Sequence, residues 1–386
     1  MTNNLNTKLI HVGDISYPYH YGINCVPAIL ESMKHLDADR FIVVTDGTVL
    51  NLHGSQFLPG LSSLAPVTLL SVPPGDAAKS ILSLSEHLEQ AITDGATRRS
   101  VVIGFGGGAP GNLAGLVAAL LFSGVRLVHV PTTTLAAMDS VISLQQAINS
   151  SRGMNTFGTF LTPNAVYLDV QMLQSLPDRE LRSGLGEATK NCLAVRPGSI
   201  DRLRALASSG RLDEPESMLW LLEESLAVKT AVTFDDPHEQ GRGLVLEYGH
   251  TVGHALELCD RRRRGAEGFS HGASVMFGMI AAARISVEMG LMRPETLAVH
   301  TELAQVLGAP QTIPPGIEIE RMMTAIRADN KRGYLPLKAD EAALVILHDL
   351  GRPAGTSEMP LIPVPLNLIR HVLEEMSLAH AAVHQG

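Results

Sequence analysis

Residues 101–115 have the sequence VVIGFGGGAPGNLAG, in which an apolar run meets three consecutive glycines and small residues follow. A short apolar run that ends in glycines predicts a buried strand, and the small-residue segment predicts the next helix. Glycines let backbone N–H groups approach a pyrophosphate, and a helix N-terminus favours its negative charge. The spacing matches neither GxGxxG nor a Walker-type phosphate loop. The order of strand, glycines and helix nevertheless indicates a dinucleotide site.

Similar apolar runs lie on both sides of this stretch. They predict strands at 41–46, 67–72, 125–130 and 166–169, and a helix at 80–94. Alternating strands and helices predict a parallel, doubly wound, Rossmann-like sheet. We therefore expect an α/β domain that binds a dinucleotide over residues 1–175.

Polar side chains follow two of these strands. Asp46 ends the run 41–46, where α/β sheets bind ligands, and an acid there either takes ribose hydroxyls or caps the next helix. Thr132, Thr133 and Thr134 follow the run 125–130. Their hydroxyls suit phosphate or ribose contacts, although threonine also caps helices.

The second half of the chain, residues 176–386, has mainly helical periodicity. Helices are expected at 179–195, 215–234, 244–259, 271–289, 294–307, 317–328 and 366–376, with a proline-interrupted crossing at 353–365. This half therefore predicts a helical domain. Ligand sites favour domain boundaries, so we expect the chemistry where the two halves meet.

Residues 247–257 have the sequence EYGHTVGHALE. His250 and His254 stand one helical turn apart, so on a helix both imidazoles leave the same face. Imidazole is a common zinc ligand, and a catalytic zinc site usually has three protein ligands. Two such histidines can equally form a polar face or a satisfied pair in the core. Glu187 and His271, each beside small residues, would complete a Glu/His/His set with one of them.

The composition of the 386-residue chain, with 45% hydrophobic and 18% charged residues, indicates a globular protein. The net charge of −9 and the lack of a broad basic patch argue against a nucleic-acid partner, and the four arginines at 261–264 are expected in a solvated loop. Cys25, Cys192 and Cys259 show no paired or metal-type spacing, which fits a reducing compartment. Neither a signal peptide nor a membrane-length apolar run is present, so we expect a cytoplasmic protein.

Together, these motifs resemble the dehydroquinate synthase-like sugar phosphate cyclases, from VVTD at 43–46 to DNKRGY at 329–334. Within this family, EYGHT at 247–251 and Asn112 are most similar to the 2-deoxy-scyllo-inosose synthases of aminoglycoside antibiotic (2-deoxystreptamine) pathways. Dehydroquinate synthases have Asn in place of Glu247, Arg in place of Gly243 and Asp in place of Asn112.

The resemblance implies one site that carries out several steps on a sugar phosphate. Glucose 6-phosphate is oxidised by NAD⁺, loses phosphate, is reduced again and closes by an aldol reaction into the carbocycle 2-deoxy-scyllo-inosose. The chain would thus be a phosphate-eliminating carbon–oxygen lyase. The resemblance also implies a divalent metal, zinc or cobalt, that polarises the reacting oxygens, and a homodimer.

The resemblance assigns roles to individual residues. The implied metal ligands are Glu187, His250 and His271. The implied NAD contacts are Asp46, Asp76, Lys79, Gly107, Gly108, Gly111, Asn112, Thr132, Thr133 and Asn155. Substrate binding or proton transfer would involve Asp139, Gln145, Lys190, Lys229, Glu247, His254 and Lys331, with Arg332 as a further candidate. Lys229 and Lys331 can equally be ordinary surface lysines.

The chain departs from the family pattern at three positions. Gln145 replaces a lysine that is a proposed acid–base residue of the inosose synthases, Met154 replaces the lysine of Gly-Lys-Asn, and Ala273 replaces a frequent glutamate. Glutamine cannot donate a proton as an ammonium group can, and methionine cannot pair with a phosphate. Either other groups compensate, or the substrate differs, or part of the reaction is lost. The alternatives are a valiolone-type or dehydroquinate-forming cyclase, a metal-dependent polyol dehydrogenase, and a catalytically silent paralogue.

Overall fold

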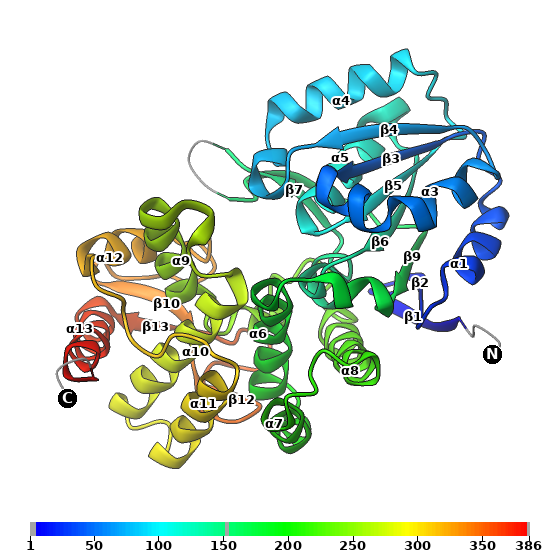
Figure 1. Ribbon diagram of the computed structural model, residues 1–386. Helices are drawn as coiled ribbons and strands as arrows, with labels where there is room; N and C mark the ends of the chain where they lie inside the picture. The colour runs from blue at the N-terminus through cyan, green and yellow to red at the C-terminus, as the bar shows by residue number, and fades with distance from the viewer. Residues whose placement is uncertain (1–4, 151–153, 384–386) are drawn as a thin grey trace. The chain divides into compact units, whose positions relative to one another are not determined.

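The computed structural model describes residues 5–150 and 154–383 (Figure 1). The chain forms two compact units: unit 1 extends to Leu181 and includes Asp213–Thr230, and unit 2 contains Arg182–Leu212 and the residues from Ala231 onwards. The sequence-based division at 175/176 did not anticipate that most of helix α8 (Pro215–Thr233) groups with unit 1. Tyr21 accounts for part of this grouping, because its hydroxyl donates to Oε1 of Glu223 at 3.0 Å. The assignment of residues 1–175 to NAD binding stays a prediction.

Unit 1 contains a seven-stranded sheet. Its strands are β1 (Asn6–Val12), β2 (Ile15–Gly22), β3 (Phe41–Asp46), β4 (Val67–Val72), β5 (Val101–Gly106), β6 (Arg126–Pro131) and β9 (Ala165–Asp169). They lie in the order β1-β2-β9-β6-β5-β3-β4, with β1 antiparallel to β2 and the other neighbours parallel. The predicted parallel sheet is confirmed, whereas the β1–β2 hairpin was not predicted.

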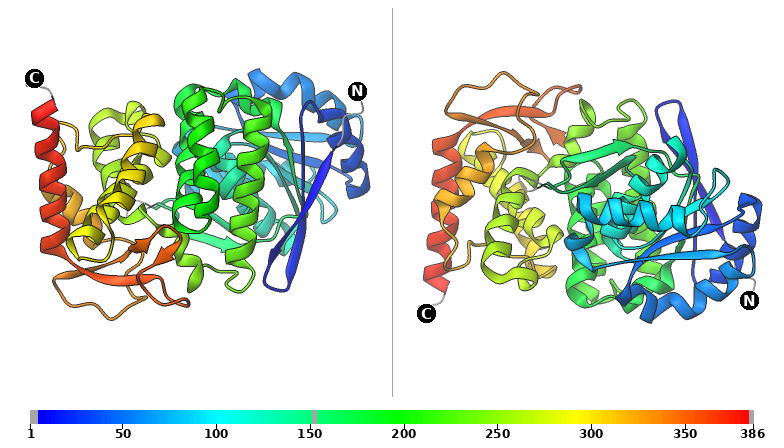
Figure 2. Two further views of the ribbon diagram at one scale, coloured as in Figure 1. Left: turned by 90° about the horizontal axis from the view of Figure 1, so that it is seen from below. Right: turned by 90° about the horizontal axis from the view of Figure 1, so that it is seen from above.

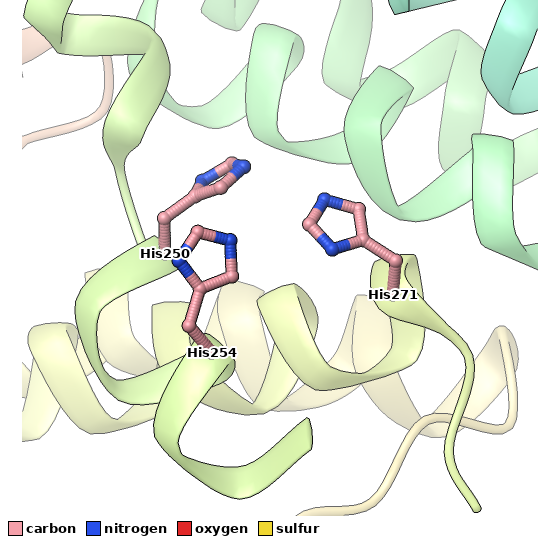
Figure 3. Close-up of side chains that lie close together, drawn as sticks. All are labelled: His250, His254 and His271. Carbon is pink, nitrogen blue, oxygen red and sulfur yellow. The ribbon is translucent and has the colours of Figure 1, made fainter. Parts of the chain in front are cut away.

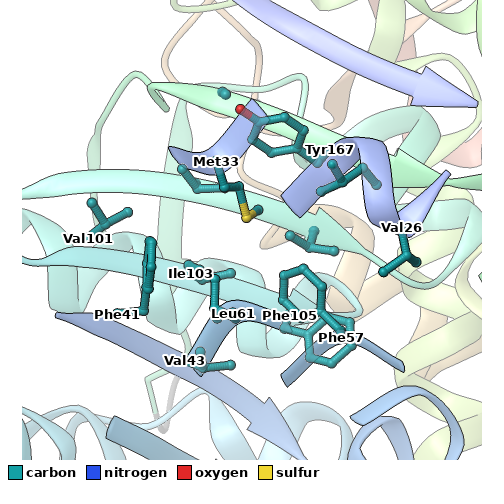
Figure 4. Packing of buried hydrophobic residues seen from close by; sticks show 14 of the residues in the cluster. Val26, Met33, Phe41, Val43, Phe57, Leu61, Val101, Ile103, Phe105 and Tyr167 are labelled. Carbon is teal, nitrogen blue, oxygen red and sulfur yellow. The ribbon is translucent and has the colours of Figure 1, made fainter. Parts of the chain in front are cut away.

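Helices cover both faces of this sheet (Figure 1). On one face, α1 (Val26–Met33) and α3 (Ser55–Ser62) pack against strand residues such as Phe41 and Val43 (Figure 4). On the other face, α4 (Ile81–Thr93) and α5 (Gly108–Leu120) cover Ile42 and Val44. Successive residues of β3 thus enter opposite cores, which is why its sequence is apolar without interruption. The doubly wound fold class is confirmed.

The strand order reverses at β3. From β3 the chain passes to β4 on one side and then crosses to β5 on the other. The carboxyl ends of β3 and β5 carry Asp46 and Gly106, and they lead into α2 (Gly47–Val49) and α5. Such a reversal is where open α/β sheets bind ligands. A separate antiparallel hairpin, β7 (Gln145–Ile148) with β8 (Phe157–Phe160), contacts α5.

Unit 2 is mainly helical, as predicted. Its helices are most of α6 (Asp178–Ala194), α7 (Ile200–Ser209), α9 (His250–Arg264), α10 (His271–Glu288), α11 (Pro294–Val306), α12 (Ile319–Arg327) and α13 (Leu366–Val383). Two small antiparallel sheets were not predicted: β10 (Glu341–Val345) with β13 (Leu361–Pro365), and β11 (Leu347–Asp349) with β12 (Arg352–Pro353). Helix α13, red in Figure 2, contacts α10 and α12.

Helix α9 corrects two expectations. It begins at His250 and not at 244, because Gly249 has φ 81° and a 3-10 turn over Arg242–Glu247 precedes it. A Cβ on Gly249 would lie 2.5 Å from Cγ of Met279, so only glycine fits there. The helix continues to Arg264, so the four arginines form its last turn and not a loop.

Two further sequence-based expectations concern membrane-spanning helices and the state of the cysteines. Within the part of the chain that the structure describes, no helix combines the length and apolar character that a membrane crossing requires. Cys25, Cys192 and Cys259 are buried and form no disulfide.

Candidate active site

Three histidines converge in unit 2 (Figure 3). His250 and His254 lie in the first two turns of α9, and His271 is the first residue of α10. Their potential ligand nitrogens all lie within 4.8 Å of one another. Since neutral imidazole is a common ligand of divalent metals, this group is a candidate metal centre.

Glu187 of α6 adds a carboxylate oxygen to this group. Its Oε1 lies 3.5 Å from Nε2 of His250 and 3.5 Å from Nε2 of His271. This oxygen is buried without a well-formed hydrogen bond from any described residue, which is unfavourable for a carboxylate. Tetrahedral ligands about 2.0–2.1 Å from zinc lie about 3.4 Å apart, so both distances from Oε1 match the spacing of ligands to one ion. Glu187, His250 and His271 therefore fit a divalent metal.

The other ring nitrogen of each of these two histidines is already engaged. Nδ1 of His271 lies 3.0 Å from Oε2 of Glu257, and Nδ1 of His250 lies 3.3 Å from the carbonyl oxygen of Tyr248. Metal-binding histidines commonly donate their second N–H to such oxygens, which fixes the ring and its tautomer. Both rings are thereby held with Nε2 facing Glu187.

Glycines bring the ligand-bearing segments together. A Cβ on Gly186 would lie 2.4 Å from the carbonyl oxygen of Gly272, and a Cβ on Gly272 would lie 1.9 Å from that of Ser183. Helix α6 can therefore approach the start of α10 only because both positions lack side chains. This contact places Glu187, which follows Gly186, beside His271, which precedes Gly272.

The charged side chains around the candidate metal centre balance one another. Burial opposes ionisation of Glu187, but Lys190, which pairs with its Oε2, and the two histidines hold the pKa of Glu187 well below its usual range. Burial disfavours the charged form of His271, yet its contacts with Glu187 and Glu257 raise its pKa to about 10. Burial and the neighbouring histidines lower the pKa of His254 to about 3. The site therefore attracts one positive charge between Glu187 and Glu257.

Glu247 and Lys331 form an ion pair close to the same site. Nζ of Lys331 lies 2.7 Å from Oε2 of Glu247 and 3.0 Å from Oδ1 of Asp329. Burial opposes ionisation of Glu247, but the ammonium of Lys331 and the nearby histidines lower its pKa far below the usual range. The Lys331 side chain is only 2% exposed, so it is not an ordinary surface lysine.

Lys229 is a buried lysine of unit 1. Nζ of Lys229 is 3.2 Å from Oδ1 of Asp139, and its side chain is 5% exposed. Asp139 belongs to the π-helical turn Ala136–Ser140, which Tyr19 holds by donating to the carbonyl oxygen of Ala137 at 2.9 Å. The surface-lysine alternative is therefore wrong for Lys229 as well.

Several predicted NAD contacts meet at the carboxyl end of the sheet. Gly107 is the N-cap of α5, and a Cβ on it would lie 3.2 Å from Cγ2 of Thr133. The N–H of Thr132 donates to the carbonyl oxygen of Gly106. Asp46 caps α2 through Oδ1, which accepts from the N–H groups of residues 48 and 49 at 2.8 and 3.1 Å. The capping interpretation of Asp46 thus holds, and its second oxygen is the one left for a ribose.

The remaining predicted NAD contacts lie around the β7–β8 hairpin. Lys79 donates to Oδ1 of Asn155, which has a left-handed backbone with φ 52°. Asn112 donates to the carbonyl oxygen of Gly108 at 2.9 Å and accepts from the N–H of Ala147 at 2.9 Å, so it attaches β7 to α5. Its side chain therefore has a structural role beside the predicted one. Asp76 is exposed in the 3-10 turn Gly75–Ala78.

Known proteins resemble this chain over nearly its whole length. Residues 69–183 match the model of the 3-dehydroquinate synthase N-terminal domain, and residues 184–332 match that of its C-terminal domain. A 2-deoxy-scyllo-inosose synthase of Streptoalloteichus tenebrarius is 43% identical over 98% of this chain and 97% of its own. One of Streptomyces lividus is 42% identical over 97% and 96%.

The chain belongs to the dehydroquinate synthase-like sugar phosphate cyclase family. A crystal structure of a 2-deoxy-scyllo-inosose synthase with carbaglucose-6-phosphate, NAD⁺ and Co²⁺ matches it with a TM-score of 0.88 and 32% identity, covering 96% of this chain and all of that one.

Two departures from the family pattern lie on the β7–β8 hairpin or next to it. Gln145 opens β7 and is exposed, and Met154 is 45% exposed. Gly153, which precedes Met154, lies outside the described residues. Ala273 is in the first turn of α10, where its N–H donates to Oγ of the N-cap Ser270. The structure thus gives Gln145 and Met154 room for longer side chains.

Sequence reasoning missed Glu257, the partner of His271. The signal was present, because Glu257 follows His250 by seven residues and His254 by three, which places it on the same helical face. The partnership itself depends on how α9 packs against α10, which no local pattern contains.

Proposed function

We propose that this chain converts D-glucose 6-phosphate into 2-deoxy-scyllo-inosose with release of phosphate, using NAD and a divalent metal. The observation that carries the proposal is the 43% identity to a 2-deoxy-scyllo-inosose synthase over 98% of the chain. The spacing of Glu187, His250 and His271 supports it, since these atoms are arranged as ligands of one ion.

The proposed metal ligands are Glu187, His250 and His271, and the glycine-rich start of α5 would receive the NAD pyrophosphate. When bound, NAD takes up and returns a hydride, and the metal polarises the reacting oxygens. Gly107 and Gly108 are partly exposed at this helix start, whereas Gly111 is buried beside His129. Zinc and cobalt both suit the donor set of one carboxylate and two imidazoles.

Proton transfer is assigned to side chains near the proposed metal ligands. Lys331 holds Glu247 as a carboxylate, so Glu247 can accept a hydrogen bond from a substrate hydroxyl at neutral pH, and its lowered pKa makes it a weak base while Lys331 stays paired with it. His254, with a pKa of about 3, stays neutral and can accept a hydrogen bond from a substrate hydroxyl. Lys190 is buried against Glu187, and this pairing supports a role in orienting Glu187 beside any contact with substrate.

Positive charge for the substrate phosphate is assigned to one buried and one exposed cation. Lys229 provides a buried ammonium group in unit 1, oriented by Asp139. Arg332, next to Lys331, is exposed and remains a further candidate.

A catalytically silent paralogue is the second candidate, and Gln145 is the observation that favours it. A glutamine amide cannot exchange a proton as a lysine ammonium can, so any acid–base step assigned to this position needs another group. Such a paralogue would bind metal and NAD but would not turn over.

We also propose that the protein is a homodimer in the cytoplasm and acts in the biosynthesis of an aminoglycoside antibiotic. These statements rest on the family resemblance and, for the reducing compartment, on three buried cysteines that form no disulfide.

The test is incubation of cobalt-loaded protein with NAD⁺ and glucose 6-phosphate, followed by mass spectrometry of the products and assay of phosphate. A heptulose phosphate and glycerol serve as parallel substrates. Formation of 2-deoxy-scyllo-inosose from glucose 6-phosphate alone supports the proposal. Phosphate release only from the heptulose, or NADH accumulation with glycerol, would replace it by another cyclase or a dehydrogenase. Binding of metal and NAD without any turnover would favour the silent paralogue.

A further inference from the structure

The arginine run at 261–264 reaches the partner of a proposed metal ligand. Nη2 of Arg261 lies 2.7 Å from Oε1 of Glu257, one turn earlier on α9. The other oxygen of this carboxylate, Oε2, lies 3.0 Å from Nδ1 of His271. Arg261 and His271 therefore contact the two oxygens of one carboxylate, whose side chain is 2% exposed.

A second arginine of the run holds the segment that leads to His271. Arg264 donates through Nε to Oδ1 of Asp260 at 2.8 Å and through Nη2 to Oδ2. Asp260 is fully buried, and its Oδ2 also accepts from the N–H of Phe269 at 2.7 Å. The guanidinium lies 4.6 Å from the centre of the Phe269 ring. Phe269 stands two residues before His271, so this contact fixes the connection between α9 and α10.

These contacts matter for metal binding because a metal ligand must be held in one orientation. A hydrogen bond from Nδ1 to a carboxylate fixes the imidazole and leaves Nε2 for the metal. The carboxylate can do this only if its own position is fixed and its buried charge is balanced. Arg261 balances this charge through an ion pair with the oxygen that His271 does not use, and this attraction opposes movement of the carboxylate, although the oxygen accepts no well-formed hydrogen bond from any described residue.

We propose that Arg261 is a positioning residue of the metal centre. Through Glu257 it holds the imidazole of His271 with Nε2 facing Oε1 of Glu187, while Arg264 and Asp260 hold the preceding connection. The inference rests on the metal site of the proposed function but does not require that the protein turns over glucose 6-phosphate.

The first test compares Arg261→Ala with Arg262→Ala. Arg262 is exposed on the same turn and is a matched control for charge and helix position. Metal-free protein is titrated with Co²⁺ against a chromophoric chelator, and the visible absorption of bound Co²⁺ reports its ligand geometry. We expect Arg261→Ala to bind Co²⁺ about 10-fold more weakly, with an altered spectrum, as is typical when an outer partner of a metal ligand is lost. Arg262→Ala should bind within about 2-fold of the unchanged protein.

A double-mutant comparison separates positioning from a general loss of stability. Once Glu257→Gln has removed the carboxylate charge, adding Arg261→Ala should weaken Co²⁺ binding by less than about 2-fold, because coupled residues are not additive. Arg261→Lys keeps the positive charge and suits a helix, so it should bind Co²⁺ nearly as tightly as the unchanged protein. It also replaces Arg261→Ala in the comparison if the alanine variant does not fold.

Three results would overturn the proposal: affinity of Arg261→Ala equal to the unchanged protein, an equal loss in Arg262→Ala, or full additivity with Glu257→Gln. Because the readout is metal affinity, a lack of turnover in every variant would contradict the proposed function and leave this test valid.

Discussion

Oε1 of Glu187 lies 3.5 Å from Nε2 of His271, and this buried oxygen accepts no well-formed hydrogen bond from any described residue. The same oxygen is 3.5 Å from Nε2 of His250. A cation bound by all three atoms would satisfy the carboxylate oxygen and both imidazoles at once. The three histidines alone also meet the spacing of a metal site, so two ligand sets compete: one with Glu187 and one with His254.

Two substitutions distinguish these ligand sets. We expect Glu187→Gln to lower Co²⁺ affinity by more than the roughly 10–100-fold that loss of an outer partner costs, because a charged ligand is removed. His254→Ala should bind Co²⁺ with an affinity within a few-fold of the unchanged protein. The measurement is chelator competition followed by metal analysis of the purified variants. The reverse order of effects would assign the site to the three histidines.

The ion pair of Lys331 and Glu247 should govern stability in acid. Replacing Lys331 by Met leaves Glu247 without its closest cation, and we expect a loss of about 3 kcal/mol in the free energy of unfolding at pH 7, at the low end for a buried pair because Glu247 is 26% exposed. Since the pKa of Glu247 is lowered in the folded protein, its contribution is present above the unfolded pKa of about 4.3 and is lost as the pH falls further. The difference between the two proteins should therefore stay constant above about pH 5 and shrink progressively between about pH 5 and pH 3.

Lys338→Met is the control for this measurement. Lys338 lies 3.5 Å from Glu341 but is 80% exposed, so its removal should change the free energy of unfolding by less than about 1 kcal/mol. Urea unfolding at several pH values gives the change in free energy of unfolding for the Lys331 variant and for the Lys338 variant. An unchanged difference between the Lys331 variant and the parent protein across this pH range would contradict the account of the pair.

Asp46→Asn separates helix capping from cofactor binding. Asparagine caps helices about as well as aspartate, so the melting temperature should change little. Loss of the charge that a ribose hydroxyl would use should weaken NAD binding by roughly 10-fold, which corresponds to a hydrogen bond to a charged group. Calorimetric titration with NAD⁺ is the measurement. Unchanged affinity would leave Asp46 with capping alone.

Gln145→Lys restores the cation found in relatives. Gln145 is exposed on β7, so the substitution should cost little stability. If the acid–base step at this position limits turnover, phosphate release from glucose 6-phosphate should rise by roughly 10²–10⁴-fold. Met154→Lys, made alone, is the comparison and should change mainly KM. Equal rates in Gln145→Lys and the parent protein would show that another group serves this step.

The sequence predicted the elements that are apolar on both faces. The six residues of β3 are all buried, so the uninterrupted run Phe41–Asp46 gave its bounds correctly. The hairpin β1–β2 was missed although Tyr17, Tyr19 and Tyr21 occupy alternate positions, because the proline at 18 argues against a strand. The start of α9 was missed because it depends on the close approach of Gly249 to α10.

The candidate site was predicted as residue types but not as contacts. Neighbouring small residues pointed to Glu187 and His271, and the contact of Gly186 with Gly272 gives the physical reason. The arginine run was assigned to a loop, although Arg261 and Arg264 each follow an acid by four residues, which is a helical spacing. That Glu257 also reaches His271 depends on the packing of α9 against α10.

The most direct test of the proposed function is the stoichiometry of phosphate and NADH in one reaction. Cobalt-loaded protein receives glucose 6-phosphate in large excess over NAD⁺, and phosphate, the carbocycle and absorbance at the NADH band are followed together. The account predicts many phosphates released per NAD, formation of 2-deoxy-scyllo-inosose and no net NADH. One NADH per substrate consumed with the phosphate retained, or no product from protein that holds both metal and NAD, would contradict it.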